Sequence, residues 1–426
     1  MPKNMRDSGY KNDPMQRLSV GSIVLLAFLH FSSGTLAAQS CVYVVNLGSD
    51  TVSVIDVFTN TVTKTILVGR NPNGIVTSAY GGFTCVTNFG SNDVSLIDPN
   101  TQTVAGRVAV GAGPVGIARP PGLDTADPDI PESLAYVTNK QGGSVSVIEV
   151  GTARVIATIP VDPIPENVAV WGSWAYVTHA ASLGSVSVID RGTNTVTAKI
   201  PVGARPGRMA FARDGRLYIA NFGSFNISVI DTGTNTVTGT IGLSLRPSGI
   251  SVTPDGRFAY VTNFGAPIVS IIPTRTDVVH ALIAVGDQPA AVAHVPNRVR
   301  AYTYVANSGS DTVSVINRAS RNQIMATIAV GHRPFAVAVG GGNCAASAAA
   351  PPTAAPSGAR TSGVDPTANG VPTATLAPSS AAAHPTTATT GTTSATGGCA
   401  IGDLTAASSA LLCLLPAGLW WLRRRR

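Results

Sequence analysis

Short runs of β-branched and aromatic residues alternate along most of the chain with clusters of Gly, Pro, Asn and Asp. One unit reads GISVT at 249–253, AYVTN at 259–263, IVSII at 268–272 and VVHALIAVG at 278–286. Short β-branched runs bounded by turn residues are typical of β-strands. This region shows no long stretch with the apolar spacing of a helix. The pattern therefore predicts an all-β body with four strands in each unit of about 42 residues.

Three motifs recur in the same order, seven times each. The first is a YVTN-like string that ends at Asn46, Asn88, Asn139, His179, Asn221, Asn263 and Asn307. The second is a VSVID-like string that ends at Asp56, Asp98, Glu149, Asp190, Asp231, Pro273 and Asn317. The third is a proline after a VG-like turn, at Pro72, Pro114, Pro165, Pro206, Pro247, Pro289 and Pro334. Four strands in a unit of this length indicate the blade of a β-propeller.

The YVTN strings, with the VSVID, TNTV and VGxxPxG elements, resemble the YVTN-repeat β-propellers of bacterial and archaeal surface proteins. The resemblance covers about residues 41–341 and implies an all-β, seven-bladed β-propeller with four-stranded antiparallel blades. The array begins with a second strand and ends with FAVAV (335–339), which matches the innermost position. We therefore expect the N- and C-terminal strands to pair within one shared blade, which closes the ring and removes exposed sheet edges.

Two cysteines flank the array. Cys41 comes just before the first expected strand and Cys344 just after the last. Because these strands are expected to be antiparallel neighbours, the two cysteines should form a disulfide in an oxidising compartment. Chain-entropy reasoning allows such a bond up to about 5 kcal/mol of stabilisation. A lipid on Cys41, with Cys344 free, is the alternative. Cys85 takes the tyrosine place of its motif and is expected to be a buried lone thiol.

The N-terminal segment has the features of an export signal. A basic stretch precedes the apolar run at 18–31 and the small residues at 32–40, as in secretory signal peptides. We expect residues 1–40 to be this signal, with cleavage between Ala37 and Cys41; an ordinary buried helix is the alternative. After the array, residues 345–396 are mostly Ala, Thr, Ser, Pro and Gly. This composition cannot bury enough apolar surface to fold, so we expect a disordered stalk.

Residues 397–426 combine a short motif, an apolar stretch and a basic end. The apolar stretch, 404–422, has 19 residues, and at ~1.5 Å per residue it is long enough to cross a hydrocarbon core. Four arginines follow it, which favours a cytoplasmic end. With Gly397, Gly398 and Cys399 just before it, the tail resembles bacterial C-terminal sorting signals of the Gly-Gly type. That resemblance implies a sorting protease and a modified Cys399. A permanent membrane anchor is the alternative.

The charge balance weighs against a nucleic-acid binder. The formal net charge is +7, but residues 41–344 hold 20 basic and 18 acidic side chains, which leaves +2. The excess positive charge therefore lies in the two terminal segments, whereas a nucleic-acid-binding domain concentrates it on its own surface. No nucleic-acid partner is expected.

Motifs for catalysis, metal or cofactor binding do not occur in the sequence. The sequence contains no motif for covalent haem attachment, a P-loop, a zinc protease or a serine hydrolase. The four histidines of the body, His179, His280, His294 and His332, fit no metal spacing. The sequence therefore predicts no catalytic residue, no metal and no cofactor. The motif asparagines and aspartates are expected to close turns.

One cluster departs from the repeat average. The turns before the innermost strands should surround one mouth of the central channel, and they carry Arg70, Arg205, Arg208, Arg246, His332 and Arg333, with Asp162, Glu166 and Asp287 in the same mouth. Concave positive clusters can hold carboxylate or phosphate groups. We hypothesise that this mouth binds an anionic ligand or an acidic partner loop; scattered, solvated arginines are the alternative. The acidic insertion at 118–133 should lie on the opposite face, as a second contact surface or a tolerated loop.

These features favour a non-catalytic propeller that is exported to the cell envelope or outer surface and acts as a binding scaffold on a stalk. The membrane and a sorting protease are further expected partners. A propeller enzyme of the lactonase, streptogramin lyase or oxidoreductase-subunit type is the alternative, although the innermost strands are mostly small and apolar. Binding of single-stranded nucleic acid is the second alternative, which the aromatic content of 6% disfavours.

Mass spectrometry of the mature envelope protein, with and without reduction, tests the two terminal segments. We expect a chain that starts near Cys41, ends near Cys399 and contains a Cys41–Cys344 crosslink. An intact C-terminus would contradict sorting and leave a membrane-tethered propeller. A diacylglycerol on Cys41 would exclude the disulfide.

Overall fold

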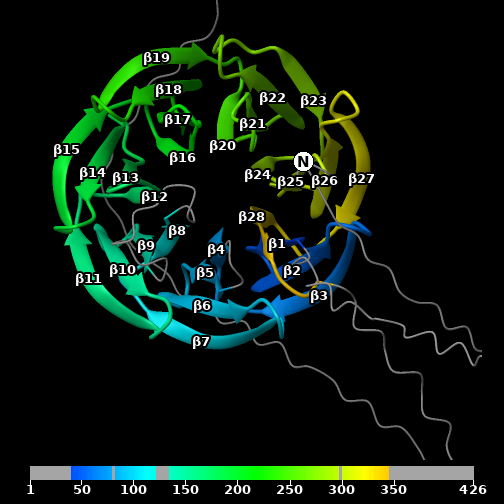
Figure 1. Cartoon of the computed structure of the whole chain (residues 1–426), viewed down its shortest axis with the longest axis horizontal. Coiled ribbons are helices and arrows are strands. Elements are labelled where there is room, and N and C mark those ends of the chain that lie inside the picture. The colour runs from blue at the N-terminus through cyan, green and yellow to red at the C-terminus, as the bar shows by residue number, and fades with distance from the viewer. Residues whose placement is uncertain (1–39, 79–81, 121–133, 297–299, 345–426) are drawn as a thin grey trace, which may run out of the picture. The chain divides into compact units, whose positions relative to one another are not determined.

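A computed structural model of the protein describes residues 40–78, 82–120, 134–296 and 300–344. These residues form β-strands and turns, with no helix among them (Figure 1), and accordingly no described helix could cross a membrane. The expected signal peptide, stalk and sorting tail lie outside the described residues, apart from Ser40, as does most of the acidic insertion at 118–133.

The strands form seven four-stranded antiparallel sheets around a central channel, which is a seven-bladed β-propeller (Figure 1). From the innermost strand outward, blade 1 is β28 (Pro334–Gly341), β1 (Ser40–Asn46), β2 (Thr51–Asp56) and β3 (Thr61–Leu67); blade 2 is β4 (Pro72–Val76), β5 (Thr84–Asn88), β6 (Asp93–Asp98) and β7 (Thr103–Ala109); blade 3 is β8 (Pro114–Ala118), β9 (Leu134–Asn139), β10 (Ser144–Glu149) and β11 (Arg154–Pro160); blade 4 is β12 (Pro165–Trp171), β13 (Trp174–His179), β14 (Ser185–Asp190) and β15 (Thr195–Pro201); blade 5 is β16 (Pro206–Phe211), β17 (Arg216–Asn221), β18 (Asn226–Asp231) and β19 (Thr236–Gly242); blade 6 is β20 (Arg246–Val252), β21 (Phe258–Phe264), β22 (Ile268–Pro273) and β23 (Ala281–Ala284); blade 7 is β24 (Pro289–His294), β25 (Tyr302–Asn307), β26 (Thr312–Asn317) and β27 (Gln323–Ala329). The fold class expected from the repeats is confirmed.

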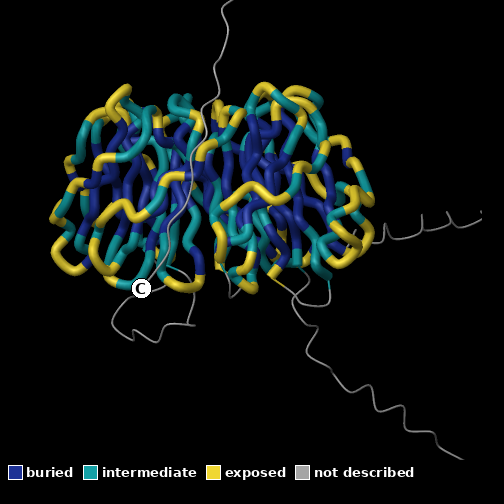
Figure 2. Tube along the Cα trace, turned by 90° about the horizontal axis from the view of Figure 1, so that it is seen from above, coloured by how far each residue is buried: buried dark blue, intermediate teal, exposed yellow. Residues whose placement is uncertain are grey.

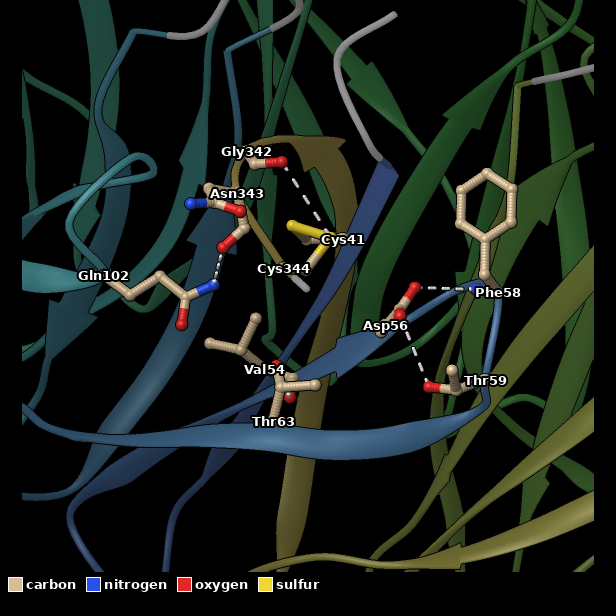
Figure 3. Close-up of a disulfide and its surroundings, with 10 residues drawn as sticks. All are labelled: Cys41, Val54, Asp56, Phe58, Thr59, Thr63, Gln102, Gly342, Asn343 and Cys344. Carbon is tan, nitrogen blue, oxygen red and sulfur yellow. Dashed lines mark hydrogen bonds between the residues drawn. A yellow bond between two sulfur atoms is a disulfide. The ribbon is translucent and has the colours of Figure 1, made fainter. Parts of the chain in front are cut away.

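Blade 1 closes the ring with strands from both ends of the array. β28 pairs antiparallel with β1, with Cys41 opposite Gly340. A disulfide joins Cys41 to Cys344, with the two Cα atoms 5.6 Å apart (Figure 3). The segment before Cys344 also binds blade 2, because the Asn343 amide donates to the carbonyl of Pro99 at 3.1 Å. The last described residues therefore join blade 1 to blade 2.

Burial decreases from the middle of each blade to its outer edge. The second and third strands are almost wholly buried, whereas the fourth strands are mostly exposed or half-buried, with one buried residue near the end in β3 and β19. Figure 2 shows buried residues through the middle of the ring and exposed ones at the turns and outer rim. The hydrophobic core thus lies between neighbouring blades, where the faces of adjacent sheets stack.

The fourth strand of blade 6 is shorter than the sequence indicates. A strand was expected to extend from 278 to 286, but β23 covers only Ala281–Ala284. The preceding turn runs on to Asp277, which has a φ of 55° and donates its amide to the carbonyl of Pro273. The exposed Val278 and Val279 consequently lie between this turn and the strand, and are not part of the strand.

In blades 4 to 7 a buried tyrosine of the YVTN motif bonds to the next blade. The Tyr260 hydroxyl donates to Asn322 Oδ1 at 2.6 Å, and Tyr304 donates to Asn60 Oδ1 at 2.7 Å. Both asparagines hold the left-handed turn position after a third strand, with φ of 61° and 54°. Because the tyrosine and the asparagine of each bond belong to different blades, the bond fixes the rotation of one sheet against its neighbour.

Blade 2 shows that the two positions of this contact change together. Cys85 replaces the tyrosine and is a buried free thiol, and burial raises its pKa to about 12. Ala153 replaces the asparagine on blade 3 and packs in the same apolar cluster as Cys85. With Cys85 facing Ala153, no tyrosine hydroxyl and no asparagine amide is left without a partner. Replacing only one of the two residues would leave such a group unpaired and would destabilise the fold.

A double-mutant cycle at Tyr260 and Asn322 tests the contact. Tyr260→Phe should lower the free energy of unfolding by about 1 kcal/mol, because one hydrogen bond is lost. Asn322→Gly keeps the left-handed conformation but leaves the buried hydroxyl unpaired, at a cost of about 1–3 kcal/mol. The double variant should cost less than the sum. Additive effects in denaturant unfolding would show that the bond does not couple the blades.

Candidate functional site

The innermost strands line a central channel that holds two cavities. One, of about 390 Å³, opens at the mouth surrounded by the turns that precede the seven motif prolines; we call this mouth the proline mouth and this cavity the proline-mouth chamber. The other, of about 350 Å³, lies towards the opposite mouth. Arg208 and Asn167 line both cavities, so the two side chains lie where the cavities meet.

One repeat position supplies the wall of the proline-mouth chamber. The residue directly after the motif proline lines it in all seven blades: Asn73, Val115, Glu166, Gly207, Ser248, Ala290 and Phe335. The buried asparagine amides fix this geometry. Asn307 Nδ2 donates to Ser314 Oγ at 2.9 Å, and a Cβ on Gly286 of the preceding turn would lie only 2.7 Å from the Asn307 amide. A side chain at Gly286 would displace this amide, so the turn passes close against it.

These asparagines are structural, as expected, but their partners differ from the expectation. They mainly bond side-chain hydroxyls of the adjacent third strand rather than turn backbone, as in Asn46 Nδ2 to Ser53 Oγ at 2.9 Å. Asn88 and Asn263 also bond to backbone, since Asn88 Oδ1 accepts from the Gly69 amide at 3.1 Å and Asn263 Nδ2 donates to the carbonyls of Val261 and Ile268.

Arg205 and Arg246 stack on aromatic rings at the proline mouth. The guanidinium carbons of Arg205 and Arg246 lie 5.2 and 5.5 Å from the centre of the Phe222 ring. Arg246 also lies over Phe225 at 5.3 Å, and Phe222 is 6.0 Å from Phe264. A guanidinium that stacks on a ring by its face keeps its N–H edge available for a planar anion.

Arg208 extends from β16 across the channel to blade 1. Its Nη2 donates to the carbonyl of Phe335 at 3.0 Å, and its guanidinium carbon lies 5.5 Å from the centre of the Phe335 ring. Burial lowers the pKa of Arg208, and the negative charge of Glu166 partly opposes this shift. Glu166 itself pairs with Lys140 at 2.6 Å. Within the described residues, no carboxylate forms an ion pair with Arg205, Arg208 or Arg246.

The predicted basic cluster divides into two groups. Arg205 and Arg208 line the chamber and Arg246 stacks beside it, whereas Arg70, His332 and Arg333 do not line it. His332 pairs with Asp311 at 2.9 Å, and the Arg333 amide donates to the same carboxylate.

The sequence could not reveal this division, because residues from one turn point in different directions. Arg70 and His332 hold the first position between glycine and proline, and no residue at that position lines the chamber. Sequence reasoning missed Phe222, Phe264, Phe335 and Lys140. Each of them directly follows a motif proline or a motif asparagine, and this position in the repeat could have identified them.

Blade 4 replaces the repeated asparagine and glycine with His179 and Asp162. His179 Nε2 lies 2.8 Å from Ser187 Oγ, a spacing that suits a serine nucleophile and its base. Ser187, however, is only 2% exposed and matches the third-strand serines of the other blades. The arrangement is therefore a variant of the structural contact. Within the described ranges, no group of three or more His, Cys, Asp or Glu side chains could hold a metal.

Solved structures that resemble this one show propeller folds of very different sequence. A functionally unknown protein from Desulfotomaculum acetoxidans matches with a TM-score of 0.61 and 14% identity, over 71% of this chain and 99% of its own. Kuenenia stuttgartiensis hydrazine synthase matches at 0.55 and 23%, over 62% and 88%. Apo AztD from Citrobacter koseri matches at 0.51 and 14%, over 72% and 99%. No protein-family model and no curated protein matches the chain. At these identities the likeness extends to the fold alone.

Restoring the repeat residues in blade 4 tests the structural role of His179. Burial lowers the pKa of His179 below its ordinary value of 6.5, so the unfolded chain binds a proton there at a higher pH than the folded one. The stability that follows is present above pH 6.5 and is lost as the pH falls below it. His179→Asn with Asp162→Gly should flatten this part of the stability curve, whereas His280→Asn, at an exposed site, should not. An unchanged acid slope in the double variant would rule this role out.

Proposed function

We propose that this protein is a non-catalytic binding propeller that receives an anionic ligand or an acidic partner segment at its proline mouth. The observation that carries the proposal is the set of three arginines, Arg205, Arg208 and Arg246, which surround or adjoin the chamber without a carboxylate partner among the described residues. Guanidinium groups bind carboxylates and phosphates in a planar, two-point fashion. An anion from outside would therefore complete the site.

The position of the chain ends supports display of this mouth. β1 starts at Ser40 and ends at Asn46 beside the proline turn, while β28 starts at Pro334 and runs the opposite way. The described chain therefore begins and ends on the face opposite the proline mouth. The described residues that adjoin the proposed stalk, up to Cys344, therefore lie away from the proline mouth. We propose that the protein is exported to the cell envelope and that it belongs to the YVTN-repeat propellers.

The lining of the chamber favours binding over catalysis. No histidine lines it, and its one hydroxyl side chain, Ser248, bonds to the carbonyl of Pro289 at 2.7 Å. Glu166 is engaged by Lys140. A nucleophile with a base in hydrogen-bond reach, which acyl transfer would need, is thus not found among the described lining residues.

Isothermal titration of the full-length protein with citrate, benzoate and a glutamate oligomer tests the proposal. At least one of these anions should bind, and Arg205→Ala with Arg246→Ala should weaken that binding by about tenfold or more, since charge-assisted bonds are lost. Arg70→Ala removes the same charge from the same mouth but outside the chamber, and should have little effect. Equal losses in both variants, or none in either, would contradict a site in the chamber.

A further inference from the structure

We propose that the proline-mouth chamber takes a small organic carboxylate with a flat apolar body, and that Arg208 selects the carboxylate from the floor of the chamber. This inference rests on the proposed binding function and names the class of ligand for the same site. An aromatic carboxylate is the simplest member of that class.

Arg208 stands at a position where the inner strands usually leave no room for a side chain. The equivalent residue in the other blades is small or short: Gly74, Gly116, Asn167, Gly249, Ala291 and Ala336. A Cβ on Gly249 would lie 2.7 Å from the carbonyl oxygen of Ala290 on the next inner strand. Blade 5 places an arginine at this position, and its side chain reaches the far wall at Phe335.

Blade 5 also lacks the contact that accompanies glycine at this position. In blade 2, Thr87 Oγ1 accepts from the Gly74 amide at 2.8 Å and donates to the carbonyl of Val115 at 2.7 Å, which ties two inner strands together. Ala220 takes the threonine place in blade 5, so it cannot form these bonds. Val45 and Ala306 likewise replace the threonine in blades 1 and 7, but only blade 5 combines this loss with a charged side chain at the inner-strand position.

No carboxylate among the described residues forms an ion pair with Arg208, and the charge of Glu166 offsets the cost of its burial only in part. The structure gives it one hydrogen bond, to a backbone carbonyl, and one ring contact. A guanidinium has five N–H donors, and a buried charge is costly unless an opposite charge accompanies it. The lowered pKa of Arg208 reflects this cost. A ligand carboxylate at the floor would supply the missing charge.

The walls above Arg208 are largely apolar. Phe222, Phe264 and Phe335 contribute aromatic rings, and Pro206 and Pro247 add flat apolar surface. Phe222 and Phe264 are tilted by 56°, which offers both a face and an edge to a third ring. A volume of about 390 Å³ is in the range of small-molecule sites, which are mainly apolar with a few placed polar groups.

A small molecule fits these observations better than an acidic protein segment. An acidic segment would meet Arg205 and Arg246 at the mouth, where both are exposed, and would not need Arg208. An inorganic anion would reach Arg208 but would leave the aromatic walls in contact with water. Only a ligand with both an anionic end and an apolar body uses the floor and the walls together.

Titration of the full-length protein with naphthoate and with naphthamide, its uncharged counterpart, tests the inference. Naphthoate should bind and naphthamide should bind at least tenfold more weakly. Arg208→Met, which keeps much of the side-chain volume, should weaken naphthoate binding by tenfold or more while leaving naphthamide binding unchanged. Arg208→Lys should fall between, because it keeps the charge but loses the planar fork. Arg70→Ala is the matched control, and thermal unfolding checks that each variant folds.

Each other outcome overturns the inference. Naphthoate binding that survives Arg208→Met but is lost in the Arg205/Arg246 double variant would leave the proposed anion site standing and remove Arg208 from it. A glutamate oligomer that binds without regard to Arg208 and more tightly than naphthoate would identify an acidic protein segment as the ligand class. Sulfate or phosphate that binds as tightly as naphthoate would exclude the apolar body. If no variant weakens the binding of any of these anions, the proposed function is refuted as well.

Discussion

The buried asparagine amide that ends the second strand of most blades is the contact on which the rest of the ring depends. It bonds the serine of the third strand on one side and excludes any side chain from the preceding crossover turn on the other, as at Gly286 and Gly331. The turn therefore passes close against this amide before the motif proline. The residue after that proline then faces the channel in every blade. A local contact without any ligand role thus determines where a ligand site can be built.

Several departures from the repeat come in pairs. His179 with Asp162, and Cys85 with Ala153, each replace both members of a contact. Arg208 with Ala220 is different, because Ala220 cannot form the bonds of the motif threonine and Arg208 brings a positive charge into the channel.

The sequence predicted the fold closely because repetition provides independent copies of each strand and turn. The shared blade followed from the phase of the array, since the chain starts with YVVN and ends with FAVAV. The site was predicted less completely. Arg205 and Arg208 lie in the chamber, but Arg70 and His332 do not, because sequence gives the place of a residue in a turn and not the direction of its side chain. The bond from Tyr260 to Asn322 was also missed, since it joins residues 62 positions apart in neighbouring blades.

A heavy-atom anion in a crystal would locate the site directly. Anomalous scattering from crystals soaked with para-iodobenzoate should give an iodine peak inside the proline-mouth chamber, with the carboxylate on Arg208 and the ring beside Phe222 and Phe264. Iodine only on the outer surface, or a carboxylate held at the mouth with Arg208 still bound to Phe335 alone, would contradict a carboxylate site at the floor of the channel.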